Sequence, residues 1–320
     1  MSSMNKPLLL KPAAKDYLWG GSRLKDDFGK AISLSPLAET WECSTHPDGQ
    51  SLVAETGEPL GELLNRHVDY LGSHPLYLTG GKAELPILIK LIDAKQDLSV
   101  QVHPDDEYAL KNEGEFGKTE MWYVLDAVPD AKLIYGLNRK VTKKELQEYI
   151  NSDRITELCN FVPVKKGDVF FIPAGTVHAI GEGMLIAEVQ QNSNITYRVS
   201  DYGRLGADGK PRALHKEKAL DVISREPTPL KRDIKETVTA STKEKQLADC
   251  KYFNVKVIDL SGQIELCQKD SFVSLLMLEG EAVLEYTDGC INLKKADSVF
   301  IPAGIDIIVK GKAKILVSRV

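Results

Sequence analysis

The chain has 320 residues, a formal net charge of −5 and 42% hydrophobic residues. This length and apolar content are ordinary for a soluble globular protein, and they allow a large core divided between two domains. The small acidic excess gives no electrostatic basis for binding nucleic acid or an acidic membrane surface. An anionic small substrate would therefore need a local basic pocket.

The cysteines and the first residues of the chain indicate the cellular compartment of the protein. The five cysteines lie far apart and form no Cys-x-x-Cys pair, which fits a reducing compartment better than a disulfide framework. The first ten residues contain one apolar run, Leu8-Leu9-Leu10, which is too short for a signal-peptide core or a membrane span. We therefore expect a cytoplasmic protein that does not enter a membrane.

Helices are expected as insertions in a chain that is otherwise rich in strands. Apolar residues recur at helical spacing over residues 59–71, which predicts a first helix. Alternation over 99–102 predicts a strand. Thr142 and Glu145 form a capping box that predicts a second helix after Thr142. A third helix is expected over 214–223.

An internal repeat indicates the architecture. The eleven-residue string that begins at Lys165 returns from Lys294 onwards with eight positions identical. Each copy follows short runs of β-branched and aromatic residues, so the repeated unit is predicted to be a β-sandwich or barrel. The chain is therefore expected to be mainly β, with two such units in tandem.

A set of metal-ligand residues lies in the first unit. Gln101 and His103, at i and i+2 of a predicted strand, point to the same face and can reach one ion. Glu120 is a half-buried acid that needs a compensating cation, and His178 follows the turn that ends the repeated string. Taken singly, each histidine is more typical of a structural role, Gln101 of a hydrogen-bonded strand residue, and Glu120 of an ion pair with Lys118. The joint pattern favours the ligand set of a catalytic Zn²⁺ or a non-haem Fe²⁺ with an open position.

The second unit lacks this set, because Ile307 occupies the position that corresponds to His178. Residues 226–247 include a stretch rich in Pro, Thr, Lys and Glu with few large apolar side chains, which marks a linker region. We therefore expect a catalytic metal-binding unit with helical insertions over 1–225. A C-terminal degenerate unit without a metal site is expected over 248–320.

The turn that ends the first copy of the repeat has a recognisable spacing. Gly167, Pro173, Gly175 and His178 fill the pattern Gly-x5-Pro-x-Gly-x2-His. Together with a histidine-bearing strand and a later glutamate, this pattern resembles the cupin β-barrels. The resemblance implies two tandem cupin (jelly-roll β-barrel) units, and we place zinc ahead of iron as the metal.

Further strings are spread over essentially the whole chain: residues 17–21, 85–90, 98–104, 118–121 and 197–204, together with Glu188. These strings resemble type I phosphomannose isomerases in their short bacterial form. The resemblance implies interconversion of mannose 6-phosphate and fructose 6-phosphate by proton transfer between C1 and C2 through a cis-enediol. It also implies one zinc ion per chain, held by Gln101, His103, Glu120 and His178.

The reaction needs a general base, for which the resemblance offers several candidates. Lys118 is the first choice, because a lysine beside Zn²⁺ and other cations can become neutral and basic. Lys90 could act in the same way or bind a substrate oxygen. Glu188, in the apolar run after His178, is either a buried structural partner or part of the site. Without the resemblance, either lysine would be read as a solvated surface charge.

The phosphate group needs fixed cationic donors. Arg198 and Arg204 are candidates because a guanidinium can bind two phosphate oxygens at once. A salt bridge to Asp201 is the alternative, and Arg198 is preferred to Arg204 as a site residue. Ser99 shares the face of Gln101 and could donate its hydroxyl to the phosphate or the sugar. A hydroxyl buried in the core is nearly as good an account of it.

Two positions depart from the longer members of the family. Ile180 occupies the place where many have a tyrosine two residues after the second metal histidine. Asn194 occupies the place where many have an aspartate four residues before the active-site arginine. An asparagine cannot act as a general base, which puts a ring-opening role at this position in doubt.

Two other functions stay open at this point. A non-haem iron oxygenase would use His103, Glu120 and His178 as its facial triad. A sugar-binding cupin would hold its ligand without turnover. Basic residues around the site favour the sugar phosphate, and the lysine beside the metal favours catalysis. We expect a monomer or homodimer, in which the second unit packs on the first and shapes the pocket mouth or forms a subunit interface.

Overall fold

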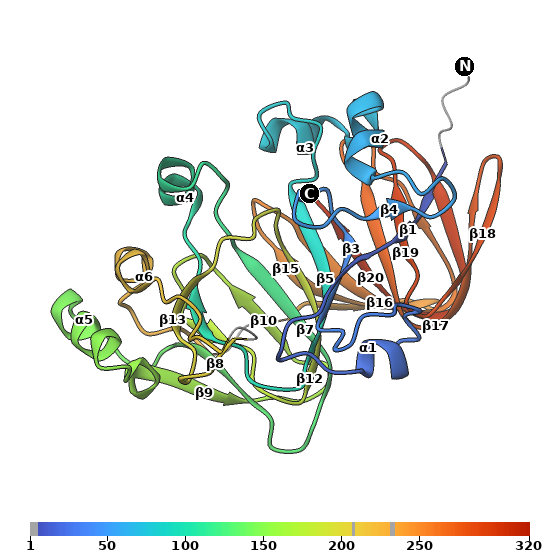
Figure 1. The fold of residues 1–320 in the computed structure, drawn as a ribbon. Coiled ribbons are helices and arrows are strands. Elements are labelled where there is room, and N and C mark those ends of the chain that lie inside the picture. The colour runs from blue at the N-terminus through green and yellow to red at the C-terminus, as the bar shows by residue number, and fades with distance from the viewer. Residues whose placement is uncertain (1–5, 207–208, 231–233) are drawn as a thin grey trace.

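The computed structural model describes residues 6–206, 209–230 and 234–320, and strands dominate it (Figure 1). In these ranges the strands form three sheets in which neighbouring strands pair antiparallel. The prediction of a mainly β protein is confirmed.

Two of the sheets face each other and form the first unit. One contains β2 (Ala13–Lys15), β3 (Glu39–Cys43), β5 (Ile87–Ala94), β7 (Glu120–Ala127), β10 (Val169–Ile172) and β12 (Met184–Gln191), in the order β10-β7-β12-β5-β3-β2. The other contains β6 (Val100–Val102), β8 (Lys132–Leu137), β9 (Cys159–Pro163), β11 (His178–Ala179) and β13 (Tyr197–Ser200), in the order β13-β6-β11-β8-β9. Side chains from both sheets, among them Trp122, Ile186 and Tyr135, form one buried core.

The third sheet forms the second unit. Its inner face carries a separate core that includes Leu275, Val299 and Val309. The strands run in the order β14-β15-β16-β20-β17-β19-β1-β4, with β18 paired to β17. They are β1 (Leu8–Lys11), β4 (Leu52–Val53), β14 (Glu236–Val238), β15 (Thr242–Asp249), β16 (Asn254–Leu266), β17 (Val273–Tyr286), β18 (Gly289–Lys294), β19 (Ser298–Ile301) and β20 (Ile307–Arg319).

Strand alternation decides which side chains enter the first unit. All eight residues of β5 are buried, because successive side chains point to opposite faces and both faces are covered. Ile87, Ile89 and Leu91 belong to the core shared with the second unit, whereas Ile92 belongs to the interior of the first. Lys90, two residues from Ile92, therefore points into the first unit.

The predicted helices are present with shifted ends. The expected helix over 59–71 is divided into α2 (Leu60–Arg66) and the 3₁₀ helix η1 (Val68–Leu71). The helix predicted after Thr142 is confirmed as α5 (Lys143–Asn151), with the Thr142 hydroxyl accepting from the Glu145 amide at 3.2 Å. The Glu145 carboxylate pairs with Arg139 at 2.6 Å. The expected helix over 214–223 is α6 (Lys216–Val222). The remaining helical segments are α1 (Arg23–Asp26), α3 (Ser73–Leu78), α4 (Asp106–Asn112) and η2 (Ile155–Leu158).

Part of the expected linker region 226–247 is regular structure. It contains β14 and most of β15, while residues 231–233 lie outside the described ranges. The polar sequence suits an edge strand, because all three side chains of β14 are exposed. At the other end of the chain, β1 pairs with β19 of the second unit. The division at residues 225 and 248 stays a prediction.

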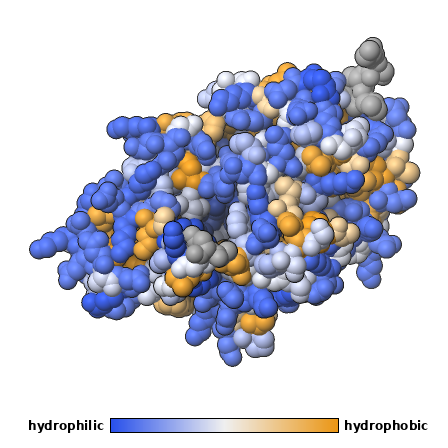
Figure 2. Space-filling model, viewed as in Figure 1, coloured by the Kyte–Doolittle hydropathy of each residue, from blue (hydrophilic) through white to orange (hydrophobic). Residues whose placement is uncertain are grey.

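None of the helices in the described ranges is long and apolar enough to cross a membrane. On the face of the molecule seen in Figure 2, apolar residues lie in small groups among polar ones.

Candidate metal centre and active-site cavity

Three of the predicted metal ligands meet inside the first unit. His103 directly follows β6, Glu120 is the first residue of β7, and His178 is the first residue of β11. The Nε2 atoms of the two histidines are 3.1 Å apart. Glu120 Oε1 lies 3.2 Å from His178 Nε2, and Glu120 Oε2 lies 3.5 Å from His103 Nε2. The three side chains are fully buried and can hold one ion.

Backbone carbonyls fix the tautomer of both imidazoles. His103 Nδ1 lies 2.7 Å from the carbonyl oxygen of Ile195, and His178 Nδ1 lies 2.8 Å from that of Thr176. A carbonyl can only accept, so each Nδ1 carries the proton and each Nε2 presents a lone pair. Burial lowers the pKa of His103 well below its ordinary value and that of His178 to about 4. Both rings are therefore neutral ligands at physiological pH.

The carboxylate of Glu120 also needs a cation. Burial raises its pKa to about 7, although Lys118 acts in the opposite direction. Lys118 Nζ lies 2.8 Å from Oε2, while Oε1 has no hydrogen-bond donor among the described residues. A buried oxygen without a donor beside two imidazole lone pairs fits a metal ligand set.

Gln101 lies at the edge of this cluster. Its strand pairs with β11 so that Gln101 is opposite His178, and its amide nitrogen lies 3.4 Å from His178 Nε2. Rotation of the amide by 180° would present the oxygen instead. The structure therefore brings all four predicted ligands together, with Gln101 as the one nearest the open side.

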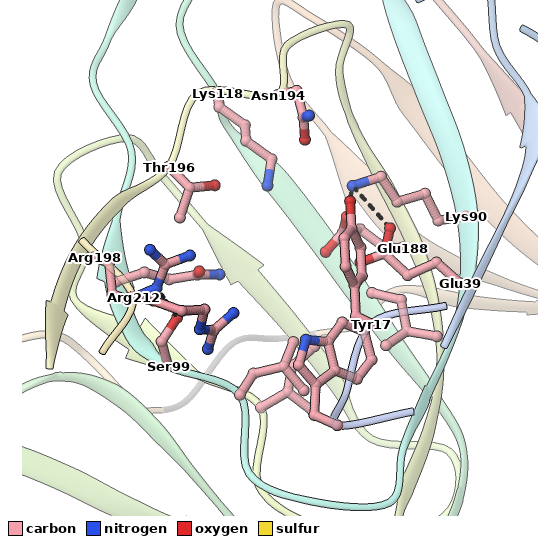
Figure 3. Close-up of a pocket in the computed structure, with 15 residues that line it drawn as sticks. Tyr17, Glu39, Lys90, Ser99, Lys118, Glu188, Asn194, Thr196, Arg198 and Arg212 are labelled. Carbon is pink, nitrogen blue, oxygen red and sulfur yellow. Dashed lines mark hydrogen bonds and ion pairs between the residues drawn. The ribbon is translucent and has the colours of Figure 1, made fainter. Parts of the chain in front are cut away.

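Figure 3 shows the residues that line a cavity of about 300 Å³. The cavity lies beside the three candidate ligands, because Gln101 and Lys118, which contact the two histidines, line it. Six predicted site residues line it: Lys90, Ser99, Gln101, Lys118, Glu188 and Arg198. Within the described ranges no residue after Arg212 lines it, so the second unit does not shape its mouth as expected. The other lining residues are Tyr17, Trp19, Glu39, Ile92, Leu98, Ile180, Asn194, Thr196 and Arg212.

One wall of the cavity is cationic. Arg198 Nε donates to the Ser99 hydroxyl at 3.3 Å, and Arg212 lies beside it (Figure 3). Burial, and then the charge of Arg212, lowers the pKa of Arg198. Arg204, by contrast, is not among the lining residues, and its guanidinium binds Asp201 and the Asp97 carbonyl. Arg212 lines the cavity although its guanidinium also donates to both carboxylate oxygens of Asp201, at 2.5 and 2.7 Å. The alternative of a salt bridge to Asp201 describes Arg204 better than a phosphate contact.

The opposite wall holds a lysine between two acids. Lys90 Nζ lies 3.3 Å from Glu188 and 3.8 Å from Glu39. Burial alone would lower the pKa of Lys90, but the two carboxylates outweigh it and raise that pKa. The charge of Lys90 likewise outweighs burial at Glu188 and lowers its pKa. The indole of Trp41 donates to Glu39 at 2.7 Å, which fixes that carboxylate in place.

Sequence reasoning missed Glu39, Arg212 and Tyr17 as residues of the cavity. An acid in the apolar stretch around Trp41 was an available signal for Glu39, whereas the loop around Arg212 carries no comparable pattern. Burial and the nearby Glu39 raise the pKa of Tyr17 to about 12. Asn194, which lines the cavity, donates to Asp48 at 2.8 Å.

Comparison with known proteins identifies the family. Residues 8–123 match the model for the catalytic domain of type I phosphomannose isomerase, and residues 243–320 match the cupin domain of mannose-6-phosphate isomerase. Mannose-6-phosphate isomerase ManA of Bacillus subtilis is 40% identical over 98% of this chain and 99% of its own. The chain belongs to the type I phosphomannose isomerase family.

Other members of the phosphomannose isomerase family support the assignment over the full length. Mannose-6-phosphate isomerase of Streptococcus mutans is 37% identical over 93% of each chain. The crystal structure of the mannose 6-phosphate isomerase from Bacillus subtilis superposes with a TM-score of 0.90 at 38% identity, covering 98% of this chain and 99% of that one. The expected fold of two cupin units is confirmed, and the chain is an enzyme of this family.

Metal binding can be tested without an activity assay. We expect the chain to bind one equivalent of Zn²⁺ in equilibrium dialysis. His178→Ala should weaken binding by more than about a hundredfold, because even residues that only orient a ligand contribute about ten- to a hundredfold. His74→Ala, on the exposed part of α3, is the matched control and should bind like the wild type. Equal affinity in all three proteins would contradict the assignment.

Proposed function

We propose that this chain is a zinc-dependent aldose-ketose isomerase that interconverts mannose 6-phosphate and fructose 6-phosphate. The position of Lys118 carries the proposal: its Nζ lies 3.2 Å from His103 Nε2 and 2.8 Å from Glu120, and it also lines the cavity. Lys118, which can move a proton, therefore lies both against the candidate metal ligands and at the cavity. The relatives named above are isomerases, which favours this function over an oxygenase or a non-catalytic sugar-binding protein.

Zinc suits the donor set of two neutral imidazoles, one carboxylate and the amide of Gln101. When bound, it would act as a Lewis acid toward the sugar oxygens at C1 and C2. The lone pairs of His103 and His178 and the Glu120 oxygen without a donor support a divalent cation between these three side chains.

We assign proton transfer to Lys118. In its neutral form the amine would take the proton from C2 of the open-chain aldose. The C–H electron pair would form the C1=C2 double bond while the carbonyl pair moves to O1, which gives the cis-enediol once O1 takes up a proton. Loss of the O2 proton and return of the first proton to C1 would then give the ketose. The side chain is almost fully buried, so bulk water is kept from the transferred proton. Lys90, which its two carboxylates keep protonated, is better suited to donate hydrogen bonds to a sugar oxygen than to act as the base. Glu188 would hold Lys90 in place.

We assign the phosphate to the cationic wall. Arg198 and Ser99 are joined by a hydrogen bond and face the cavity together with Arg212 (Figure 3). A phosphate bound there would direct the rest of the sugar across the cavity toward Lys118. Charge-assisted bonds to two guanidinium groups are strong and geometrically selective.

The activity has a direct test. Purified chain should convert mannose 6-phosphate to fructose 6-phosphate in a coupled assay, lose the activity with a chelator and regain it with Zn²⁺. Lys118→Gln should lower kcat by about a hundredfold or more, since a general base contributes about 10²- to 10⁴-fold. Lys111→Gln, on the exposed side of α4, is the control. Oxygen uptake with bound iron, or full activity in Lys118→Gln, would refute the proposal.

The phosphate site is tested by a pair of arginine variants. Arg198→Ala should lower kcat/KM for the sugar phosphate by about ten- to a hundredfold, because a hydrogen bond to a charged group contributes about 1.5–3 kcal/mol. Arg204→Ala should change kcat/KM much less, since Arg204 does not line the cavity. The opposite order of effects would place the phosphate at Arg204.

A further inference from the structure

A turn of the second unit reaches the loops that carry the metal ligands. Tyr252, between β15 and β16, donates its hydroxyl to Asp106 Oδ2 at 2.9 Å. Asp106 is the first residue of α4 and lies three residues after His103. The neighbouring Lys251 Nζ is 3.6 Å from the same oxygen, but its side chain is 70% exposed, and such surface pairs contribute little. The hydroxyl is therefore the specific connection.

The second oxygen of Asp106 continues the chain of hydrogen bonds. Oδ1 accepts from the Gly117 amide at 3.0 Å and from the Gln191 side-chain amide at 2.8 Å. The side-chain oxygen of Gln191 accepts from the Thr119 amide at 2.9 Å, and the Gln191 amide donates to the Thr119 carbonyl at 3.0 Å. Both backbone groups of Thr119, the residue between Lys118 and Glu120, are held by Gln191.

The two loops that Asp106 joins are in close contact. A Cβ at Gly117 would lie 2.4 Å from the carbonyl carbon of Asp105 and 2.5 Å from the Asp106 nitrogen. The Lys118 amide donates to the Pro104 carbonyl at 3.0 Å. The loop after His103 and the loop before Glu120 can therefore not shift independently. Movement of Asp106 would be transmitted to Lys118, whose Nζ lies 3.2 Å from His103 Nε2.

We propose that Tyr252 is a positioning residue, which holds the backbone of Lys118 and Glu120 in place through Asp106, Gln191 and Thr119. The metal-free second unit thereby takes part in arranging a cavity that none of its described residues lines. Side chains that move a proton must be held within a fraction of an ångström, so the loss of a distant anchor lowers the rate. The activity readout rests on the proposed isomerase function, whereas the backbone readout does not.

The test compares Tyr252→Phe with Tyr286→Phe. Both remove one hydroxyl from the second unit, and Tyr286, on β17, packs against that unit's own core. Tyr252→Phe should speed amide hydrogen exchange in peptides that cover residues 116–122 and lower kcat by about tenfold, with KM changed by less than about twofold. Tyr286→Phe should leave the exchange of this segment, kcat and KM unchanged.

A double variant tests whether the hydrogen bonds from Tyr252 through Asp106 to Gln191 act as one unit. Gln191→Met removes both side-chain hydrogen bonds at similar volume, and combined with Tyr252→Phe it should lower kcat by less than the product of the two single losses. A loss of kcat in the double variant equal to the product of the two single losses would contradict the proposed series of hydrogen bonds. So would a change in KM alone, faster exchange throughout the protein, or unchanged exchange of residues 116–122 in Tyr252→Phe. If the wild type lacks isomerase activity, the proposed function fails while the exchange measurement still decides this inference.

Discussion

Two imidazole lone pairs point at each other in the centre of the first unit, and the surrounding structure is built around this arrangement. The Nε2 atoms of His103 and His178 are 3.1 Å apart, and each ring is held in its tautomer by a backbone carbonyl. Burying the carboxylate of Glu120 beside them is electrostatically costly. Lys118 Nζ, 2.8 Å from Glu120 and 3.2 Å from His103 Nε2, does not fully offset this cost, since the pKa of Glu120 stays raised. Hydrogen bonds from two antiparallel sheets keep the three side chains together despite this cost.

The charges around the cavity are segregated, which gives a small substrate a direction. Arg198 and Arg212 form one wall, while Glu39 and Glu188 with Lys90 between them form the other. A phosphate is attracted to the first wall and repelled by the acids of the second. The polar hydroxyls of a sugar, in contrast, can pair with both the lysine and the carboxylates. In the proposed function, this separation of charges would orient the sugar phosphate before any of its bonds changes.

Local patterns in the sequence were sufficient to select His103, Glu120 and His178, which the structure brings together as a possible metal site. They were insufficient for much of the cavity. Gln101 and His103 share a face because of strand alternation, and His178 follows a turn whose residues repeat in the second unit. Glu39 reaches the site only through the pairing of β3 with β5, a register that no local pattern specifies. Arg204 and Arg212 both bind Asp201, but only Arg212 of the two lines the cavity, although both lie in one loop region. The fold class was accessible from the repeat, but the assignment of β1 to the second unit was not.

The pairing of β1 with β19 joins the beginning of the chain to a strand close to its end. During synthesis, β1 cannot pair with β19 until residues 298–301 have left the ribosome. Contacts between such distant segments slow folding, because the entropy of closing a long loop is lost before the contact forms. The two barrels are therefore not consecutive modules that mature one after the other. The second barrel reaches its final form only when β1, which precedes every strand of the first barrel in the chain, joins it.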